Sequence, residues 1–91
     1  MNTDFKSSFL NDIKKVKDKN LLLKVEQSIL DVENAEKIHD IQELRKLKGS
    51  KKGIFYRIKV DRYRIGVTIE DNTVTFVAFK PRKDIYTFFP L

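Results

Sequence analysis

Apolar residues at the start of the chain recur every three or four positions, which is the spacing of a helix with one buried face. The first stripe consists of Phe5, Phe9, Ile13 and Val16. Thr3 or Asp4 can cap this helix, because their side-chain oxygens accept hydrogen bonds from free N–H groups and an acid suits the positive end of the helix dipole. The pattern therefore predicts an amphipathic helix that starts at Thr3 or Asp4.

A second stripe follows after a short break, and it consists of Leu22, Val25, Ile29 and Val32. The break from Asp18 to Asn20 contains residue types that commonly cap a helix, so we expect the second helix to begin there. Two amphipathic helices joined by a short turn form a helical hairpin. Each apolar stripe then needs a partner surface.

Between residues 33 and 52 the chain becomes polar and the longer periodicity is lost. A spacing of three persists at Ile38, Ile41, Leu44 and Leu47. This spacing predicts a short helix or an ordered connection, which Gly49 and Ser50 end.

From Gly53 onward apolar and polar residues alternate with a period of two, which is typical of strands with two different faces. The first strand alternates Tyr56, Ile58 and Val60 with Phe55, Arg57 and Lys59. The second alternates Tyr63, Ile65, Val67 and Ile69 with Arg64, Gly66 and Thr68. The third, Thr73 to Lys80, alternates Val74, Phe76 and Ala78 with Thr75, Val77 and Phe79. Turn signals at 61–62 and 70–72 separate the three strands.

These elements predict an α+β fold of two layers, with a helical hairpin packed on one face of a small antiparallel sheet of three to four strands. The length suits a single domain over residues 1–91. Pro81 stops the ladder of the third strand, and the tail 82–91 adds a fourth strand segment or a turn. Because the helices cover one sheet face, we expect the other face to be at least partly open.

Charge is unevenly distributed along the chain, which has 19 Lys and Arg, 13 Asp and Glu and a formal net charge of +6. Residues 1–43 hold 7 basic and 9 acidic residues, whereas residues 44–91 hold 12 basic and 4 acidic residues. The excess positive charge thus lies in the half that carries the strands. Such asymmetry favours a polyanionic target, with a solvated lysine-rich surface as the alternative.

Several classes of function are excluded. The chain has no cysteine, which rules out a disulfide framework, thiol catalysis and a thiolate zinc site. No His, Asp and Glu group has the spacing of metal ligands, so we expect no metal and no cofactor. The segment Met1 to Phe9 contains an acid and no apolar core, unlike a signal peptide, and no stretch is long enough to span a bilayer. We therefore expect a cytoplasmic protein with no membrane partner.

The strand alternation also gathers cations on the open face. If the apolar strand residues face the helices, then Arg57, Lys59 and Arg64 share the opposite side, and Arg82 and Tyr86 can fold over it. Arginine carries a fixed fork of donors that matches a phosphate group. The predicted patch suits a nucleic-acid backbone, and an ordinary solvated sheet face is the alternative.

Four motifs follow one another in the second half of the chain. They are Leu44-Arg45-Lys46-Leu47-Lys48-Gly49, Tyr56-Arg57-Ile58-Lys59-Val60, Tyr63-Arg64-Ile65 and Arg82-Lys83-Asp84-Ile85-Tyr86. Together with the helical hairpin before them, they resemble the RelE/ParE superfamily of toxins from bacterial type II toxin–antitoxin systems. The resemblance covers essentially the whole chain, and the cations and tyrosine favour its RelE-like side.

This resemblance implies a function, partners and site residues. RelE-like members cleave messenger RNA in the ribosomal A site, ParE-like members inhibit DNA gyrase, and a cognate antitoxin holds both inactive. The resemblance places catalytic roles on Lys59, Arg64, Arg82 and Tyr86. It places RNA binding on Arg57, Lys59, Arg64, Lys80, Arg82 and Lys83. The implied partners are an antitoxin and ribosome-bound messenger RNA, with DNA gyrase as the alternative target.

Cleavage of RNA by its own 2′-hydroxyl requires a base, stabilisation of phosphorane charge and protonation of the leaving 5′-oxygen. The single histidine, His39, lies in the polar connection and is predicted to be a surface residue. Without a catalytic histidine, the clustered cations are left to perform the catalysis. Arg64 and Arg82 can clamp the phosphate, and neighbouring cations favour a neutral Lys59 that can take a proton.

Tyr86 can stack on a base or pass a proton, with core packing beside Phe88 and Phe89 as the alternative. The predicted function is a ribosome-dependent mRNA endoribonuclease. A non-enzymatic gyrase inhibitor and a nucleic-acid-binding module without catalysis remain the alternatives.

Overall fold

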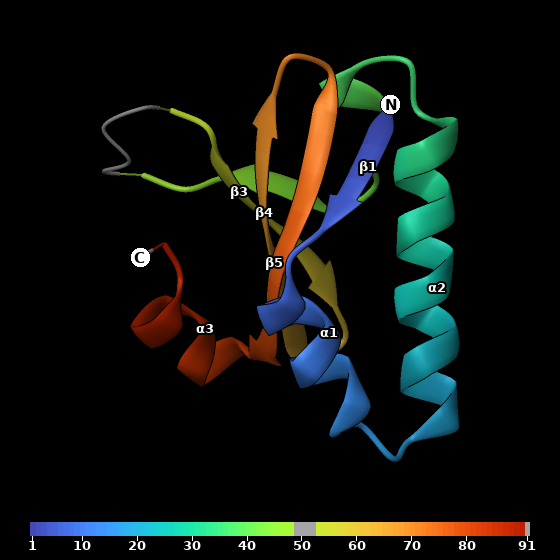
Figure 1. Ribbon diagram of the computed structural model, residues 1–91, viewed down its shortest axis with the longest axis vertical. Coiled ribbons are helices and arrows are strands. Elements are labelled where there is room, and N and C mark those ends of the chain that lie inside the picture. Colours follow the sequence, from blue (N-terminus) through green and yellow to red (C-terminus); the bar gives the residue numbers. More distant parts are fainter. Residues whose placement is uncertain (49–52, 91) are drawn as a thin grey trace.

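The computed structural model describes residues 1–48 and 53–90. The described residues form β1 (Asn2–Phe5), α1 (Ser7–Lys14), α2 (Lys19–Asn34), a 3₁₀ helix (Ile38–Asp40), β2 (Leu44–Lys46), β3 (Phe55–Val60), β4 (Tyr63–Glu70), β5 (Thr73–Pro81) and α3 (Arg82–Phe88). Five strands make one mixed sheet in the order β1-β5-β4-β3-β2. The helices α1 and α2 flank the strands on a different side from α3 (Figure 1). The predicted α+β fold is confirmed, with more strands than the three to four expected.

The first residues form a strand, so the predicted helix start at Thr3 or Asp4 is wrong. β1 pairs in parallel with β5, and the backbone N–H of Lys6 donates to the carbonyl of Phe76 at 2.9 Å. Phe5 stacks on Phe76 with ring centroids 5.0 Å apart. The sheet thus uses an apolar residue that also fits a helical spacing, because local periodicity does not reveal a pairing partner far along the chain.

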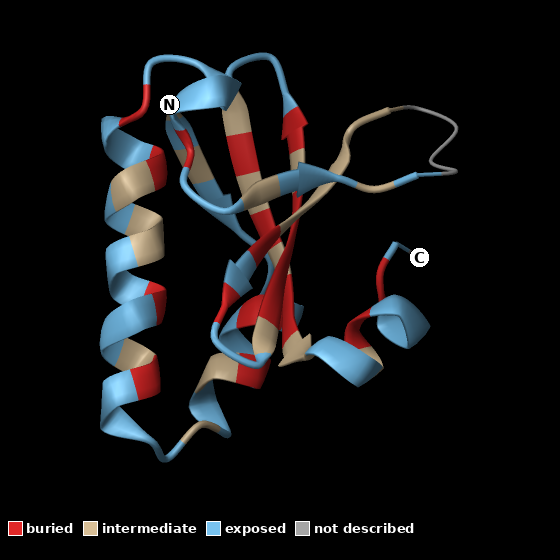
Figure 2. Ribbon diagram, turned by 180° about the vertical axis from the view of Figure 1, so that it is seen from behind, coloured by how far each residue is buried: buried red, intermediate tan, exposed pale blue. Residues whose placement is uncertain are grey.

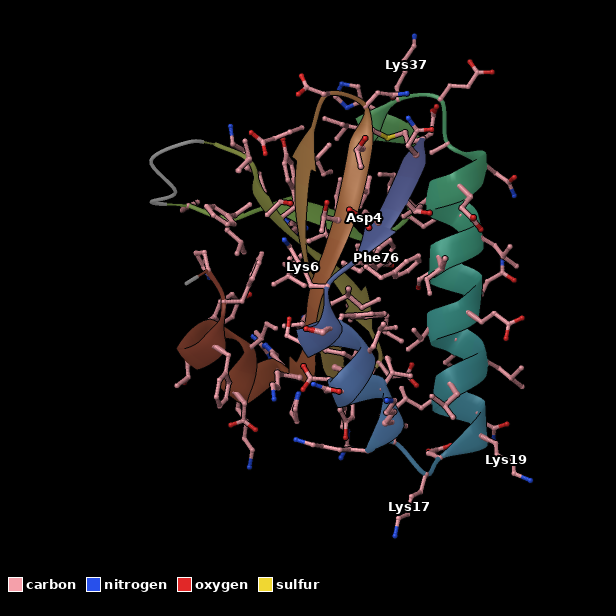
Figure 3. All side chains as sticks on the ribbon, viewed as in Figure 1. Asp4, Lys6, Lys17, Lys19, Lys37 and Phe76 are labelled. Atoms are coloured by element: carbon pink, nitrogen blue, oxygen red, sulfur yellow. The ribbon has the colours of Figure 1, made fainter. Side chains whose placement is uncertain are left out.

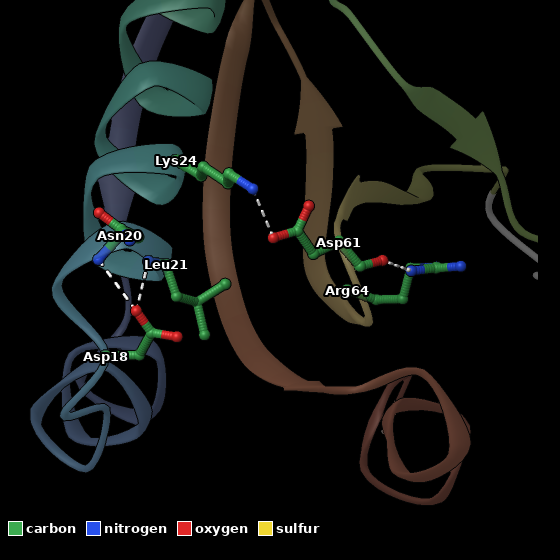
Figure 4. Close-up of polar contacts among 6 residues, drawn as sticks. All are labelled: Asp18, Asn20, Leu21, Lys24, Asp61 and Arg64. Carbon is green, nitrogen blue, oxygen red and sulfur yellow. Dashed lines mark hydrogen bonds and ion pairs between the residues drawn. The ribbon is translucent and has the colours of Figure 1, made fainter.

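The second helix is confirmed, and within the predicted capping stretch 18–20 the residue that caps it is Asp18. Its carboxylate accepts hydrogen bonds from the backbone N–H groups of Asn20 at 3.0 Å and Leu21 at 3.2 Å (Figure 4). The buried face is turned slightly from the predicted stripe, since Leu21 is buried and Leu22 is half-buried. This face packs against the main core, which is formed by Phe9, Leu21, Val25, Val32, Ala35, Ile41, Ile58, Val60, Ile65, Val67, Ile69, Val74, Phe76 and Phe79.

The polar connection contains a short helix, as expected, and also a strand that was not predicted. Ile38–Asp40 form the 3₁₀ helix, and Leu44–Lys46 form β2, which pairs antiparallel with β3. A three-residue strand is too short for its alternation to stand out from its surroundings. The predicted stop at Gly49 and Ser50 lies outside the described residues.

A β-bulge breaks the alternation of the third predicted strand. Gly66 pairs with Ala78, whereas the next residue of β4 pairs with Phe76, so Val77 is an extra residue in β5. An extra residue reverses the facing of the side chains beyond it. Phe79 therefore enters the main core and Ala78 faces the other side, so the prediction that Ala78 shares a face with Phe76 is wrong.

The tail forms α3, so the prediction of a strand segment or a turn is wrong. α3 packs on the sheet face opposite the main core through a second cluster, which consists of Ala78, Ile85 and Phe89. Buried positions accordingly occur in both the sheet and α3 (Figure 2). Part of the face that was expected to be open is thus covered. None of the described helices is long and apolar enough to cross a membrane.

Candidate nucleic-acid interface

A basic hollow of about 840 Å³ lies between the β3–β4 turn and α3. Its lining consists of Lys59, Asp61, Arg62, Arg64, Pro81, Arg82, Lys83 and Tyr86. Lys59 and Arg64 are direct partners in the β3–β4 register. Arg82 and Tyr86 are four residues apart in α3, which places them on one helix face. The structure therefore brings together all four residues that were predicted to be catalytic.

Arg64 is the buried cation of this hollow, with 7% of its surface exposed. Its Nη1 atom donates to the backbone carbonyls of Asp61 at 3.0 Å and Tyr63 at 2.9 Å. Burial lowers the pKa of Arg64 below its usual value, and the nearby charges of Arg57 and Arg82 lower it further. An anion bound here would offset this unfavourable electrostatic environment.

The turn that holds Arg64 is itself tied to α2. Asp61 has a φ of 55°, in the left-handed region, and its carboxylate pairs with Nζ of Lys24 at 2.7 Å. Figure 4 shows Asp61 between the two cations, with its carboxylate toward Lys24 and its carbonyl toward Arg64. The Asp61 carboxylate is therefore already paired and does not neutralise Arg64.

A second hollow of about 410 Å³ adjoins the first and is lined by Arg45, Lys46, Leu47, Lys48, Arg57, Tyr86 and Pro90. Arg57 donates from Nη1 to the backbone carbonyl of Glu43 at 3.3 Å. Tyr86 borders both hollows and is 56% exposed. Tyr86 is therefore not packed in the core, which was the alternative prediction, and its ring is accessible to a ligand.

Arg57 was predicted to bind RNA, whereas its neighbours Arg45, Lys46 and Lys48 were not. The pairing of β2 with β3 places Arg45 directly opposite Arg57. The signal was present as three cations within residues 45–48. It could not be placed in space because β2 was not predicted.

Lys80 does not join the basic hollow, although it was predicted to bind RNA alongside Lys83, which does. Its Nζ pairs with the carboxylate of Asp12 at 2.9 Å and lies 4.5 Å from the ring centroid of Phe88. Asp12 also accepts a hydrogen bond from the backbone N–H of Phe79 at 2.9 Å. Lys80 thus belongs to a contact between α1, β5 and α3.

Four other charged or titratable side chains lie outside the lining of the basic hollow. His39 is exposed in the 3₁₀ helix, as predicted. The exposed lysines Lys17, Lys19 and Lys37 extend outward near the two ends of α2 (Figure 3). These lysines form a solvated surface, in contrast to the arginines that converge on the basic hollow.

No model of a known protein family matches the chain. The protein named Toxin RelE3 from Methanocaldococcus jannaschii is 31% identical over 87 residues, which cover 94% of this chain and 96% of that protein. A chain in the crystal structure of a RelB–RelE antitoxin–toxin complex from Methanococcus jannaschii has a TM-score of 0.78 at 29% identity, with 96% of this chain and 99% of that chain covered.

A more distant structure shares the fold. The YoeB dimer from Staphylococcus aureus gives a TM-score of 0.69 at 22% identity, with 88% of this chain and 94% of that chain covered. The chain is thus similar in sequence to Toxin RelE3 over nearly the full length of both chains, and its fold matches that of the RelB–RelE complex chain. The predicted resemblance is confirmed on its RelE side, and the chain belongs to the RelE family of toxins.

Proposed function

We propose that this protein is the toxin of a toxin–antitoxin pair and that it cleaves messenger RNA. The observation that carries the proposal is the convergence of Arg64, Lys59, Arg82 and Tyr86 on one hollow. Kinship with Toxin RelE3 and with the toxin of a RelB–RelE complex supports it.

The reaction proposed is attack by the 2′-oxygen of a nucleotide on the adjacent phosphorus, which forms a 2′,3′-cyclic phosphate as the bond from phosphorus to the 5′-oxygen breaks. The departing 5′-oxygen takes a proton from solvent water and leaves as a hydroxyl group. Arg64 and Arg82 hold the non-bridging oxygens and stabilise the charge that grows on them. Lys59, opposite Arg64 in the sheet, takes the 2′-hydroxyl proton or acts as a further clamp. Tyr86 stacks on a neighbouring base through its exposed ring.

A ribosome-bound message is the proposed substrate. The basic hollow carries cations and a phenol but no histidine in its lining, so its chemistry is mainly electrostatic. Such a site gains most when another body holds the RNA with the 2′-oxygen in line with the leaving group. The ribosome provides that geometry for the message in its decoding site.

The proposed partner protein is a cognate antitoxin. The relative of known structure was crystallised with RelB, and this chain exposes several large apolar side chains, including Leu23 at 61% and Leu30 at 43%. A partner that binds only the folded toxin stabilises it by about 4 kcal/mol at a thousandfold excess over the dissociation constant. Thermal melts with and without the antitoxin measure this effect, and identical midpoints would contradict it.

The decisive experiment is induced expression followed by mapping of message ends. Wild-type protein should stop growth and create new 5′ ends within translated messages. Arg64→Ala should abolish both while the protein stays folded, and the matched control Lys17→Ala, outside the lining of the basic hollow, should behave like wild type. DNA breaks linked to gyrase in the absence of new message ends would overturn the proposal.

A further inference from the structure

The ring of Phe89 rests directly on the backbone of Gly66. A methyl group at Gly66 would lie 2.7 Å from two atoms of that ring, which is well inside van der Waals contact. Phe89 is 1% exposed, and its ring meets Phe55 edge-on with centroids 5.5 Å apart. The absence of a side chain at Gly66 is therefore what lets Phe89 approach the sheet this closely.

α3 depends on this contact for its place. The helix has seven residues, and so short a helix has little stability without tertiary packing. Ile85 is its buried residue, and Phe89, the first residue after the helix, is buried too. The backbone N–H of Phe89 donates to the carbonyl of Ile85 at 2.8 Å. At the other end, the N–H of Arg82 donates to the carbonyl of Arg62 at 2.8 Å. The helix is thus fastened at both ends.

The four candidate catalytic residues are divided between the sheet and α3. Arg64 and Lys59 belong to strands, whereas Arg82 and Tyr86 belong to α3. The seat of Phe89 lies two residues beyond Arg64 in β4, so it joins the two halves of the hollow at short range. Because Phe89 directly follows α3, a change in the distance between the Phe89 ring and the sheet would move α3, and with it Tyr86, relative to Arg64.

We propose that Phe89, seated on Gly66, is a positioning residue that sets the distance between α3 and the sheet and so brings Tyr86 and Arg82 against Arg64 and Lys59. The inference rests on the proposed RNA cleavage, because it assigns a role within that same site. Phe89 itself is buried under α3 and touches no substrate.

The first test is Gly66→Ala, which adds a methyl group beneath the ring. The backbone of a central strand yields less readily than α3, so we expect the helix to move outward. Because a misplacement of roughly 1 Å can cost on the order of 10²-fold in rate, kcat on ribosome-bound message should fall at least about tenfold, with KM unchanged. A merely structural role would lower the melting temperature without changing the kcat of the folded protein.

The second test asks whether the effect passes through Phe89. Phe89→Ala removes the ring, so the added methyl group then meets nothing. In that background Gly66→Ala should change kcat by less than about twofold, in contrast to its effect on wild type, as expected for coupled residues. Phe88→Leu, a change to an exposed aromatic residue of the same helix, is the matched control and should leave kcat unchanged. Equal effects of Gly66→Ala in both backgrounds would overturn the proposal.

A milder variant covers the case in which these proteins do not fold. Phe89→Leu keeps an apolar anchor but loses the ring contact, and it should lower kcat several-fold at unchanged KM. Wild-type kcat in folded Phe89→Leu and folded Gly66→Ala would refute the positioning role.

Amide hydrogen exchange separates this inference from the proposed function. Gly66→Ala should speed exchange in residues 85–89 but not in β5, and Phe88→Leu should not. If wild-type protein cleaves no message, the proposed function fails, and the exchange pattern still decides whether Gly66 and Phe89 hold α3. Unchanged exchange in Gly66→Ala rejects the anchor whatever the cleavage result.

Discussion

Arg64 donates a hydrogen bond from Nη1 to the backbone carbonyl of Asp61 over 3.0 Å, so the turn that precedes its own strand holds its guanidinium. Lys24 ties the same turn to α2 through the Asp61 carboxylate. A side chain that is already oriented loses less conformational freedom when a ligand binds. This arrangement suits a cation that must be in place before charge develops on a phosphate.

Replacing Arg64 tests whether its fork of donors matters as well as its charge. Arg64→Ala should lower the rate of message cleavage by on the order of 10²–10³. Arg64→Lys keeps a positive charge, but an ammonium cannot hold two backbone carbonyls and a phosphate in the geometry of a guanidinium, so it should restore little activity. Single-turnover cleavage measures both variants. Full activity in Arg64→Lys would show that the fork is not used.

The lowered pKa of Arg64 predicts how stability varies with pH. Because burial and neighbouring cations disfavour the charged form in the folded chain, the charge opposes folding at every pH below the folded pKa. This cost disappears only as the pH rises past the ordinary pKa of an arginine in the unfolded chain. Wild type and Arg64→Gln should therefore differ by a constant free energy of unfolding between about pH 5 and about pH 9.

Denaturant titrations at several pH values measure this difference. A gap that narrows within that range would mean that Arg64 loses its proton there or is coupled to another titrating group. Single-stranded RNA should raise the melting temperature of wild type more than that of Arg64→Gln, since a bound phosphate offsets the buried charge.

Lys59→Arg distinguishes a proton acceptor from a phosphate clamp. The substitution keeps the charge but replaces an amine, which can act as a proton acceptor once neutral, by a guanidinium, which cannot. If Lys59 is the base, cleavage should be lost while binding to ribosomes is retained. Normal cleavage by Lys59→Arg would instead identify Lys59 as a clamp. Pelleting with ribosomes and mapping of message ends give the two readouts.

The second hollow should contribute to RNA affinity through phosphate contacts. Each cation removed from it, by Arg45→Gln or Arg57→Gln, should make the salt dependence of single-stranded RNA binding less steep by roughly 0.7 in the slope of log affinity against log salt. Lys19→Gln, at an exposed position outside both hollows, is the control and should leave the slope unchanged. Binding titrations at four or more salt concentrations decide the matter, and unaltered slopes would exclude the second hollow from the RNA path.

The two ion pairs of the described residues should differ in their effect on stability. Asp12 is 9% exposed and also binds the N–H of Phe79, so Asp12→Ala leaves a buried donor unpaired and should cost about 1–3 kcal/mol. Lys24 and Asp61 are about half exposed, and Lys24→Ala should cost about 0–1 kcal/mol. Chemical denaturation measures both, and equal losses would show that burial confers no advantage on the Asp12 pair.

The periodicity of apolar residues was sufficient to predict α2, the three main strands and the turn at Asp61. It was also sufficient to place Lys59 and Arg64 on one face, because side chains two residues apart, or directly opposite across a strand pair, point the same way. The basic hollow could therefore be assigned in outline from the sequence, with Arg82 and Tyr86 added by resemblance.

The tertiary structure decided the remaining features. Phe5 lies in a strand because β1 forms hydrogen bonds with the edge of β5 and because its ring stacks on that of Phe76. Lys80 does not line the basic hollow, because its Nζ pairs at 2.9 Å with the carboxylate of Asp12, which lies 68 positions earlier in the chain. Neither partner is visible in a local pattern.

The sequence by itself determined which residues share a face, since that depends only on the repeat of a helix or a strand. Only the tertiary structure decided which distant residues meet. The bulge beside Gly66 decides which side chains of β5 face the main core, and Phe89 packs directly on that glycine. Both contacts must meet the condition that packed surfaces interdigitate without voids or overlaps. That condition is set jointly by residues from several elements, and it is what brings α3 and its Tyr86 to the cations of the sheet.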